Sequence, residues 1–344
     1  MLNLNQRVTA FSNLGDFLRS ELANPDSNWI AEQQTRAKLN NGWFEPRETR
    51  FAMEYWANQL TKANLNRWVE TESAHNIDRP IPVGLILAGN IPMVGFHDVL
   101  STIILGNNAI IKLSRNDDVL IPALIQKLTE LDSAVSEHFE IVEKLVGHEA
   151  VIATGSNNST RYFEQYFGSV PNIIRGNRTG VALLNGEETE EDLHGLMKDC
   201  FQYFGLGCRN VTKLYLPNGY DLNRIFKASL PFAYLMDNKK YNNNYTYHKA
   251  LMMMERKNVL ENELILMIEE PSLFSPVSVL NYEYYNSTTD LNHKMEKNLD
   301  DIQCIIGRNH RTFGTAQAPA LNDYADGVNT LEFLSKLHKK QLTN

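Results

Sequence analysis

Apolar side chains recur among charged ones with a period near 3.6 residues in the first part of the chain. The segment that contains Phe51, Tyr55, Trp56 and Leu60 shows this spacing clearly. It places the large side chains on one face of a helix. The pattern therefore predicts a helical segment from about residue 5 to residue 75.

A different pattern begins at Pro82, where short apolar runs alternate with amphipathic stretches. PVGLILAG (82–89) and AIIKLS (109–114) predict buried strands, and VGFHDVLSTIILG (94–106) between them predicts a helix that ends at a glycine. A strand, a helix and a strand within about thirty residues are typical of a βαβ unit, which requires a parallel sheet. The alternation continues through the predicted helices 117–131 and 159–168 and the predicted strands 149–155, 172–176 and 181–186. We therefore expect an α/β fold.

Two later segments have patterns that predict different structures, a helix followed by a strand in the first and a loop in the second. TEEDLHGLMKDCFQYFG (189–205) begins with a T-x-x-D capping signal at Thr189 and ends at Gly205, so we expect one helix, followed by the strand VTKLYLP (211–217). NKKYNNNYTYHK (238–249) is polar and rich in Asn and Tyr, and we expect a mobile loop or lid there. The methionines 252–254 predict a core helix, with the lining of an acyl channel as the alternative.

Charge and composition exclude several classes of protein. The chain carries 33 Lys+Arg and 41 Asp+Glu, a formal charge of −8, and no basic block that could follow a nucleic-acid backbone. The N-terminus lacks the unbroken apolar run of a signal peptide, and no stretch approaches the roughly 18 apolar residues of a membrane span. We expect a cytoplasmic protein with no nucleic-acid partner.

The three cysteines stand in different contexts. Their odd number and the absence of paired spacing argue against a disulfide framework and against a zinc site. Cys200 shares a predicted helix face with apolar residues, and Cys304 lies in the apolar run IQCIIG, so both are predicted to be core residues. Cys208 lies outside any apolar periodicity, and Gly205 and Gly207 leave its backbone free for unusual dihedral angles and close approach. Residue context alone leaves a catalytic thiol and a structural turn residue equally open for Cys208.

Several motifs resemble the aldehyde dehydrogenase superfamily. LILAGNIP (85–92) and NNAIIKLS (107–114) resemble its Asn-x-Pro and Lys-x-Ser segments, ATGS (153–156) its Gly-Ser cofactor turn, and GLGCRN (205–210) its nucleophile loop. RGNRTGVAL, FGLGCRNVTKLY, LFSPVSVLNY and FGTAQAPALNDYADGVNTLEFL together resemble the LuxC-type acyl-CoA reductases, which supply fatty aldehyde in bacterial bioluminescence. The resemblance covers about residues 80 to 334.

The resemblance implies an aldehyde dehydrogenase-like fold with a Rossmann-type nucleotide-binding domain and an α/β catalytic domain. The implied boundaries are a helical segment 1–80, a nucleotide-binding domain 81–178, a cysteine domain 179–313 and a C-terminal return segment 314–344. It also implies reduction of an acyl-CoA or acyl-carrier thioester to an aldehyde by NADPH, with NADH as the alternative donor. An acyl-protein synthetase as acyl-delivering partner and a homodimer are further expectations.

The same resemblance implies the site residues. Cys208 would be the nucleophile, and the Asn90 amide with the Cys208 backbone N–H would hold the oxyanion. Lys112 and Ser114 would contact the cofactor ribose and its 2′-phosphate, and Gly155 and Ser156 would approach the pyrophosphate. Simpler alternatives are a strand-to-helix turn for Asn90 and a solvated side chain for Lys112. Arg209 is either a cation that activates the thiol or an exposed loop arginine.

The sequence departs from the superfamily in two places. The stretch that matches the water-activating glutamate of the oxidising enzymes reads Arg175-Gly176-Asn177-Arg178 and holds no carboxylate. This favours a thioester reductase over a hydrolytic dehydrogenase. The two arginines either meet phosphate groups or are surface residues. A second superfamily carboxylate is missing at Ser272–Pro276.

Two other functions stay open. An acyl-phosphate reductase of the semialdehyde type would use the same cysteine with a different leaving group. A non-catalytic scaffold would only bind nucleotides or acyl groups. His97 is predicted to be a surface or core histidine, and Asp326-Gly327 a turn.

Overall fold

The computed structural model describes residues 2–72 and 79–341. These residues form two compact units, which are described separately: Met1–Gly176 with Ala320–Asn344, and Asn177–Pro319. The helical N-terminal segment, the first sheet and the C-terminal segment thus belong to one unit.

The N-terminal segment is helical, as predicted. It comprises α1 (Leu4–Ala23), α2 (Asn28–Asn40), α3 (Pro46–Gln59) and α4 (Lys62–Thr71). A capping box formed by Asn3 and Gln6 starts α1, and Pro46 occupies the first turn of α3. The rings of Phe11 and Trp56 both pack edge-on against Phe96, so these helices share the core of the first unit.

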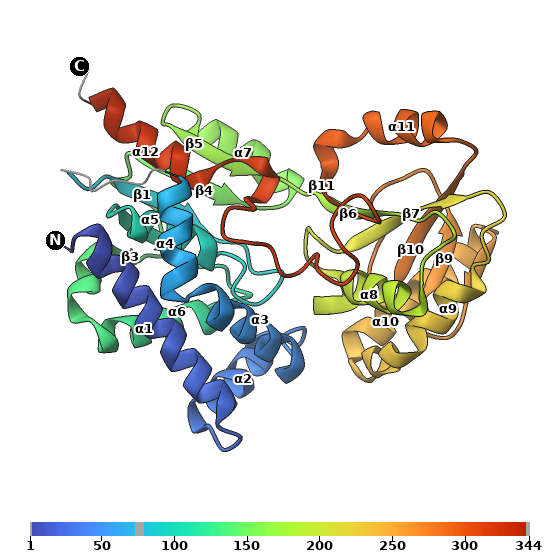
Figure 1. The fold of residues 1–344 in the computed structure, drawn as a ribbon, viewed down its shortest axis with the longest axis horizontal. Helices are drawn as coiled ribbons and strands as arrows, with labels where there is room; N and C mark the ends of the chain where they lie inside the picture. Colours follow the sequence, from blue (N-terminus) through green and yellow to red (C-terminus); the bar gives the residue numbers. More distant parts are fainter. Residues whose placement is uncertain (1, 73–78, 342–344) are drawn as a thin grey trace. The chain divides into compact units, whose positions relative to one another are not determined.

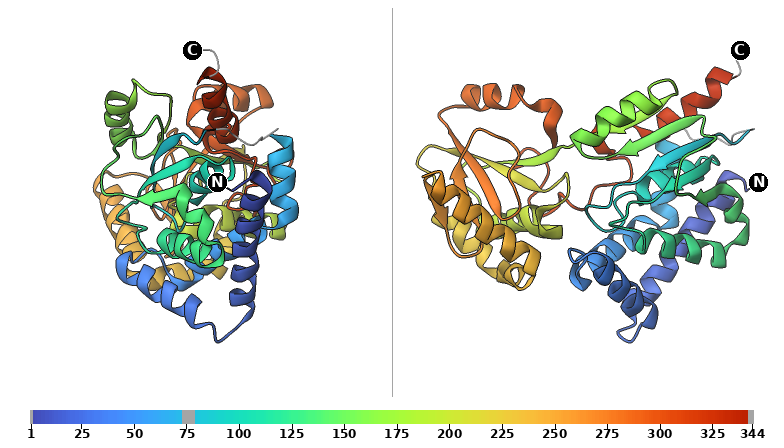
Figure 2. Two further views of the ribbon diagram at one scale, coloured as in Figure 1. Left: turned by 90° about the vertical axis from the view of Figure 1, so that its left-hand side faces the viewer. Right: turned by 180° about the vertical axis from the view of Figure 1, so that it is seen from behind.

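The first sheet is entirely parallel, with the strand order β3-β2-β1-β4-β5. Its strands are β1 (Pro82–Ile86), β2 (Asn108–Lys112), β3 (Phe139–Ile141), β4 (Ala150–Thr154) and β5 (Asn172–Arg175). Figures 1 and 2 show α7 (Asn157–Phe167) on the opposite face from α1 and α6 (Leu120–Leu131). The predicted βαβ unit is present as β1, α5 (Phe96–Ile104) and β2, while β3 and the 3-10 helix η1 (Ser133–His138) were not predicted.

Arg175 at the end of β5 connects this sheet to α5 by a buried ion pair and to the C-terminal helix α12 (Thr330–Gln341) by a hydrogen bond. The Arg175 guanidinium donates to both oxygens of Asp98, at 2.9 and 2.7 Å, and to Thr330 Oγ1 at 3.0 Å. Arg175 is only 4% exposed, so its interpretation as a surface arginine was wrong. The reason is the partner on α5, which lies 77 residues away in the chain.

Two smaller predictions concern the same region. His97 is half-buried, with its Nε2 2.9 Å from the Leu321 carbonyl oxygen and its ring beside Trp68 and Tyr324. This is the predicted structural histidine. Asp326 and Gly327 have φ angles of 59° and 67°, which confirms the predicted turn.

The second sheet has the order β11-β6-β7-β10-β9-β8 and is parallel except for the pair β8 and β9. Its strands are β6 (Thr179–Leu183), β7 (Val211–Pro217), β8 (Val259–Glu261), β9 (Leu266–Glu269), β10 (Val279–Tyr285) and β11 (Ile302–Ile306). In Figure 1, α11 (Thr288–Glu296) lies across this sheet from α8 (Glu190–Phe201), α9 (Asn223–Ser229) and α10 (Lys239–Met254). The 3-10 helices η2 (Gln202–Gly205), η3 (Leu230–Asp237), η4 (Leu299–Asp301) and η5 (Ala325–Gly327) complete the described elements.

The segment 238–249 is not a loop. It forms most of α10, whose N-cap Asn238 accepts hydrogen bonds from the backbone of Lys240 and Tyr241. Tyr241, Tyr245 and Met252 are buried, at helical spacing. The prediction failed because tyrosine rings, rather than aliphatic side chains, form the buried face. Of the three methionines only Met252 is buried, since Met253 and Met254 are exposed.

A helix that crosses a bilayer must be both long and apolar. Within residues 2–72 and 79–341, no helix combines the length and apolar character that a membrane span requires.

Candidate active site

Cys208 occupies a short turn between α8 and β7. The Asn210 N–H donates to the Gly207 carbonyl at 3.1 Å, which closes a four-residue turn with Cys208 in its second position. The thiol is half-buried, unlike a core cysteine. The chain enters the turn through Tyr203, Phe204 and Gly205, whose φ angles are 56°, 57° and 76°. Two buried aromatic residues are therefore held in the left-handed region, which L-residues rarely adopt.

The other two thiols differ from Cys208. Cys200 is 4% exposed, and burial raises its pKa well above the usual value, which confirms it as a core residue. Cys304 is half-buried, and its Sγ lies 3.6 Å from the Arg209 carbonyl oxygen. Burial raises the pKa of Cys304 to about 11, although Arg209 and Arg311 act in the opposite direction. Neither thiol is suited to ionise near neutral pH.

Arg209 is buried, with 8% of its surface exposed. The alternative of an exposed loop arginine is therefore wrong. Its position follows from the turn, which packs the backbone of residues 209 and 210 onto β6. A Cβ atom at Gly180 would lie 2.7 Å from the Arg209 oxygen and 3.0 Å from the Asn210 oxygen, so only glycine fits there.

The predicted residues of the first unit lie at the carboxyl ends of three neighbouring strands. Lys112 ends β2 and pairs in register with Ile86, the last residue of β1, while Ala153 of β4 pairs with Ile86 from the other side. Asn90 follows β1 and is exposed, and Gly155 and Ser156 follow β4 directly. The chain continues from β1 to β2 on one side, and β4 lies on the other, so this edge is a topological switch point.

The loops after β1 and β2 are in direct contact. A Cβ atom at Gly89 would lie 2.5 Å from Ser114 Oγ, so the serine packs against the residue next to Asn90. The Leu87 N–H donates to the Lys112 carbonyl at 3.1 Å. The structure therefore brings Asn90, Lys112 and Ser114 into one loop cluster.

Asp117 organises this cluster and was not singled out from the sequence. Its carboxylate accepts from the Met93 N–H at 2.7 Å and from the Leu120 N–H at 3.3 Å, which connects the Asn90 loop to the start of α6. Asp117 is 2% exposed, and burial raises its pKa to about 7, against the effect of the two hydrogen bonds. One of two adjacent aspartates in the run NDDVL (116–120) carries no sequence signal for this role.

The Asp117 carboxyl should make stability depend on pH. Because its pKa is raised from 3.8 to about 7, the folded state binds the extra proton between these values. The stabilisation of the folded state by the protonated Asp117 carboxyl is complete below about pH 4 and is lost as the pH rises through 7. Over this range the free energy of unfolding falls by up to about 1.4 kcal/mol per pH unit. Asp117→Asn cannot ionise, so its urea unfolding free energy should fall less steeply from pH 4.5 to 7.5. If the unfolding free energies of the two proteins change equally with pH, Asp117 is not the cause. Burial also raises the pKa of Asp199, to about 6, but this effect is present in both proteins and cancels in the comparison.

Gly155 and Ser156 form the start of α7. Ser156 is the N-cap and accepts from the Ser159 N–H at 3.4 Å. A Cβ atom at Gly155 would lie 2.8 Å from Ser159 Cβ, so glycine allows the helix to start directly at the strand end. Helix N-termini at this position suit anionic groups such as a pyrophosphate.

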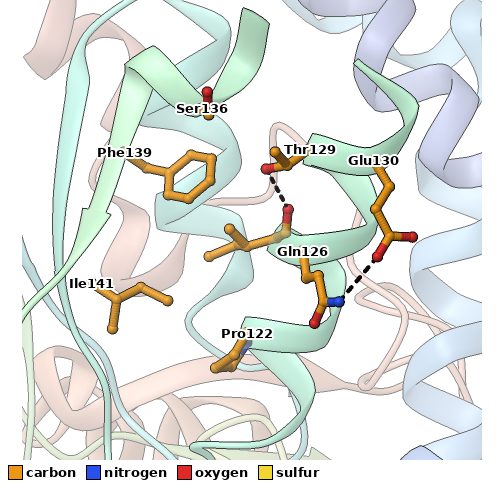
Figure 3. Close-up of a pocket in the computed structure, with 8 residues that line it drawn as sticks. Pro122, Gln126, Thr129, Glu130, Ser136, Phe139 and Ile141 are labelled. Carbon is orange, nitrogen blue, oxygen red and sulfur yellow. Dashed lines mark hydrogen bonds between the residues drawn. The ribbon is translucent and has the colours of Figure 1, made fainter. Parts of the chain in front are cut away.

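A separate depression in the first unit contains none of these residues. Its volume is about 720 Å³, and it lies between α6 and β3 (Figure 3). Its lining is mostly apolar, and the Gln126 side chain there donates to the Glu130 carboxylate at 3.0 Å. Among the residues that the structure describes, no group of three or more His, Cys, Asp or Glu side chains is placed to hold a metal ion.

The fold is that of the aldehyde dehydrogenases. Betaine aldehyde dehydrogenase from Staphylococcus aureus, in complex with NAD+, superposes with a TM-score of 0.66 over 94% of this chain and 74% of its own, at 10% identity. An aldehyde dehydrogenase from Mycobacterium tuberculosis, in complex with NAD+, has a TM-score of 0.60 over 89% of this chain and 73% of its own, at 13% identity. Aldehyde dehydrogenase C from Pseudomonas syringae, in complex with NAD+ and octanal, has a TM-score of 0.61 over 90% of this chain and 73% of its own, at 12% identity.

The family is narrower than the fold. Residues 57–225 match the family model of acyl-CoA reductase (LuxC), so over this range the chain is similar to that family. The matched range includes all six predicted site residues. No curated protein has a significantly similar sequence. Family and fold together support an oxidoreductase that acts in aldehyde chemistry.

Proposed function

We propose that the protein reduces an acyl thioester, either acyl-CoA or an acyl-protein, to the aldehyde through an acyl intermediate on Cys208. NADPH is the proposed reductant and NADH the alternative. The observation that carries the proposal is the Cys208 turn within the range that matches the acyl-CoA reductase family model. Overall, acyl-CoA, NADPH and a proton give aldehyde, free CoA and NADP+.

Cys208 is the proposed nucleophile. Its thiolate attacks the thioester carbonyl, a C–S bond forms, and the electron pair of the breaking bond leaves with the CoA sulfur. We propose that Arg209 favours the ionised thiol, since a buried guanidinium in the next residue opposes the cost of the negative charge. The Asn90 amide and the Cys208 backbone N–H are the proposed donors to the tetrahedral oxyanion.

The strand ends of the first unit fit a nicotinamide dinucleotide. The α7 N-terminus offers donors for the pyrophosphate, and Gly155 there has no room for a side chain. Lys112 is the proposed ribose contact, and Ser114 the proposed contact to a 2′-phosphate. Bound there, the reduced nicotinamide supplies the hydride that releases the acyl group as aldehyde. The NAD+ complexes of the similar dehydrogenases support the class of cofactor.

The segment from Arg175 to Arg178 supports reduction over hydrolysis. It connects β5 to β6 and offers no carboxylate to activate water. The Arg175 guanidinium is bonded to Asp98 and Thr330, so a phosphate contact is not its proposed role. An acyl-enzyme without a general base nearby should persist until it is reduced or returned to CoA.

The acyl donor and the assembly are also proposals. CoA, a carrier protein or an acyl-protein synthetase can present the same thioester chemistry, and a homodimer is the proposed assembly. A reactive thiol suits the reducing cytoplasm, where we propose that the protein acts.

The test is an assay of NADPH oxidation with a series of acyl-CoAs, in which released CoA and aldehyde are both quantified. One CoA and one aldehyde for each NADPH are expected. Acyl phosphates, offered in the same assay, should react more slowly. A preference for acyl phosphate would instead favour the semialdehyde-type reductase. Cofactor binding without turnover of either donor would favour the non-catalytic scaffold.

A further inference from the structure

Asn210 clamps both ends of the Cys208 turn. Its side-chain Oδ1 accepts from the Gly207 N–H at 2.7 Å, while its backbone N–H donates to the Gly207 carbonyl at 3.1 Å. Both polar backbone groups of Gly207 are thus bonded to Asn210. Cys208 lies between these two residues in the chain. Asn210 is completely buried, so water does not compete for these bonds.

The same side chain also holds the end of α8. Its Nδ2 donates to the carbonyl oxygens of Asp199, Cys200 and Gln202, at 2.9, 3.2 and 3.0 Å. Helix-terminal carbonyls usually receive backbone N–H groups from a glycine turn. Here the chain turns through Tyr203 and Phe204 in the left-handed region, which residues other than glycine rarely adopt. The amide therefore stabilises a strained connection directly before the cysteine.

The Asn210 backbone attaches the turn to β6. Its carbonyl oxygen accepts from the Gly180 N–H at 2.8 Å and from Thr179 Oγ1 at 3.1 Å. One buried residue thus joins α8, the Cys208 turn and the neighbouring strand.

We propose that Asn210 is the positioning residue for Cys208, the residue that holds the nucleophile in its reactive orientation. This inference rests on the proposed role of Cys208 as nucleophile. Asn210 acts through the Gly207 and α8 bonds and does not contact the substrate. Asparagine is required because the site needs one acceptor, for Gly207, and one donor, for three carbonyl oxygens. Aspartate would face those oxygens with a further oxygen, and alanine would remove the donor that Asn210 supplies to them.

The experiment compares Asn210→Ala with a matched control, Asn262→Ala. Asn262 uses the same kind of bonding in the same unit: it accepts from the Ile265 N–H at 3.1 Å and donates to Ser229 Oγ at 2.9 Å. None of its hydrogen bonds involves the Cys208 turn. Both variants should lose stability. A positioning role of Asn210 predicts that the reactivity of Cys208 changes in Asn210→Ala and not in Asn262→Ala.

Two rates are measured below the unfolding temperature of all variants: acylation of Cys208 by acyl-CoA without reductant, and alkylation by iodoacetamide from pH 6 to 9. Asn210→Ala should acylate about 100-fold more slowly, as expected for a misplaced nucleophile, and should alkylate with an altered pH profile. Asn262→Ala should match the wild type in both. If Asn210→Ala does not fold, Asn210→Asp replaces it. It keeps the Gly207 bond, and its charge should shift the alkylation profile to higher pH.

If the Asn210 variant that folds acylates within twofold of the wild-type rate, the positioning role is overturned. An equal loss of acylation in Asn262→Ala would overturn it too. Failure of the wild type to acylate with any donor would instead count against the proposed function. In that case the alkylation profiles still decide whether Asn210 controls the thiol.

Discussion

Replacement of Cys208 by alanine is expected to abolish aldehyde formation, with a loss of about 10⁴-fold or more in turnover. The acyl intermediate requires a covalent bond to the sulfur, and no other described thiol is placed to supply one. Cys200 is buried, and the pKa of Cys304 is raised to about 11. The measurement is steady-state reduction of acyl-CoA, with cofactor binding as the test of folding.

Cys304→Ala is the matched control for this variant. Its Sγ contacts the Arg209 carbonyl, so it adjoins the same turn and yet is not the proposed nucleophile. We expect it to keep most of the wild-type activity. If Cys208→Ala stays active while Cys304→Ala does not, the nucleophile has been misassigned.

Asn90→Ala should reduce turnover by about 10²- to 10³-fold, the usual effect of removing one oxyanion donor. The loss should appear in kcat and in the rate of Cys208 acylation, because the donor acts on charge that develops during attack. The affinity for NADPH should be unchanged, since Lys112, Ser114 and the α7 N-terminus are intact. Stopped-flow acylation and cofactor titration separate the two effects.

Asn58→Ala, an exposed asparagine on α3 of the same unit, is the control for Asn90→Ala and should behave as the wild type. An Asn90→Ala protein that acylates at the normal rate would leave Asn90 as a simple turn residue after β1. That outcome would also restrict the proposed oxyanion site to backbone donors.

Local signals in the sequence were sufficient for much of the fold. The capping box at Thr189 starts α8 as predicted. The strand that ends at Lys112 and the strands before Asn90 and Gly155 are where the apolar runs placed them. Parallel strands align their carboxyl ends, so residues far apart in the chain gather at one edge without any signal of their own. This explains why these residues of the first unit lie at one edge of the sheet, while their roles in the site stay predictions.

The errors share a physical cause. Arg175 and Arg209 are buried because they meet partners that are distant in sequence. The helix from Lys239 to Met254 was missed because its buried face is aromatic, which the apolar pattern did not reveal. Asn210 and Asp117 were missed for the same reason, because each acts through backbone groups of other segments. A single polar residue gives no indication of which carbonyl or amide it will meet.

The acyl bond to Cys208 can be observed by intact-protein mass spectrometry. Wild type and Cys208→Ala are incubated with a panel of acyl-CoAs without reductant. We predict one added acyl group on the wild type alone, removed when NADPH is added, with the most reactive chain length identified in the same experiment. An adduct of equal amount on Cys208→Ala, or an adduct that NADPH leaves in place, would contradict the account.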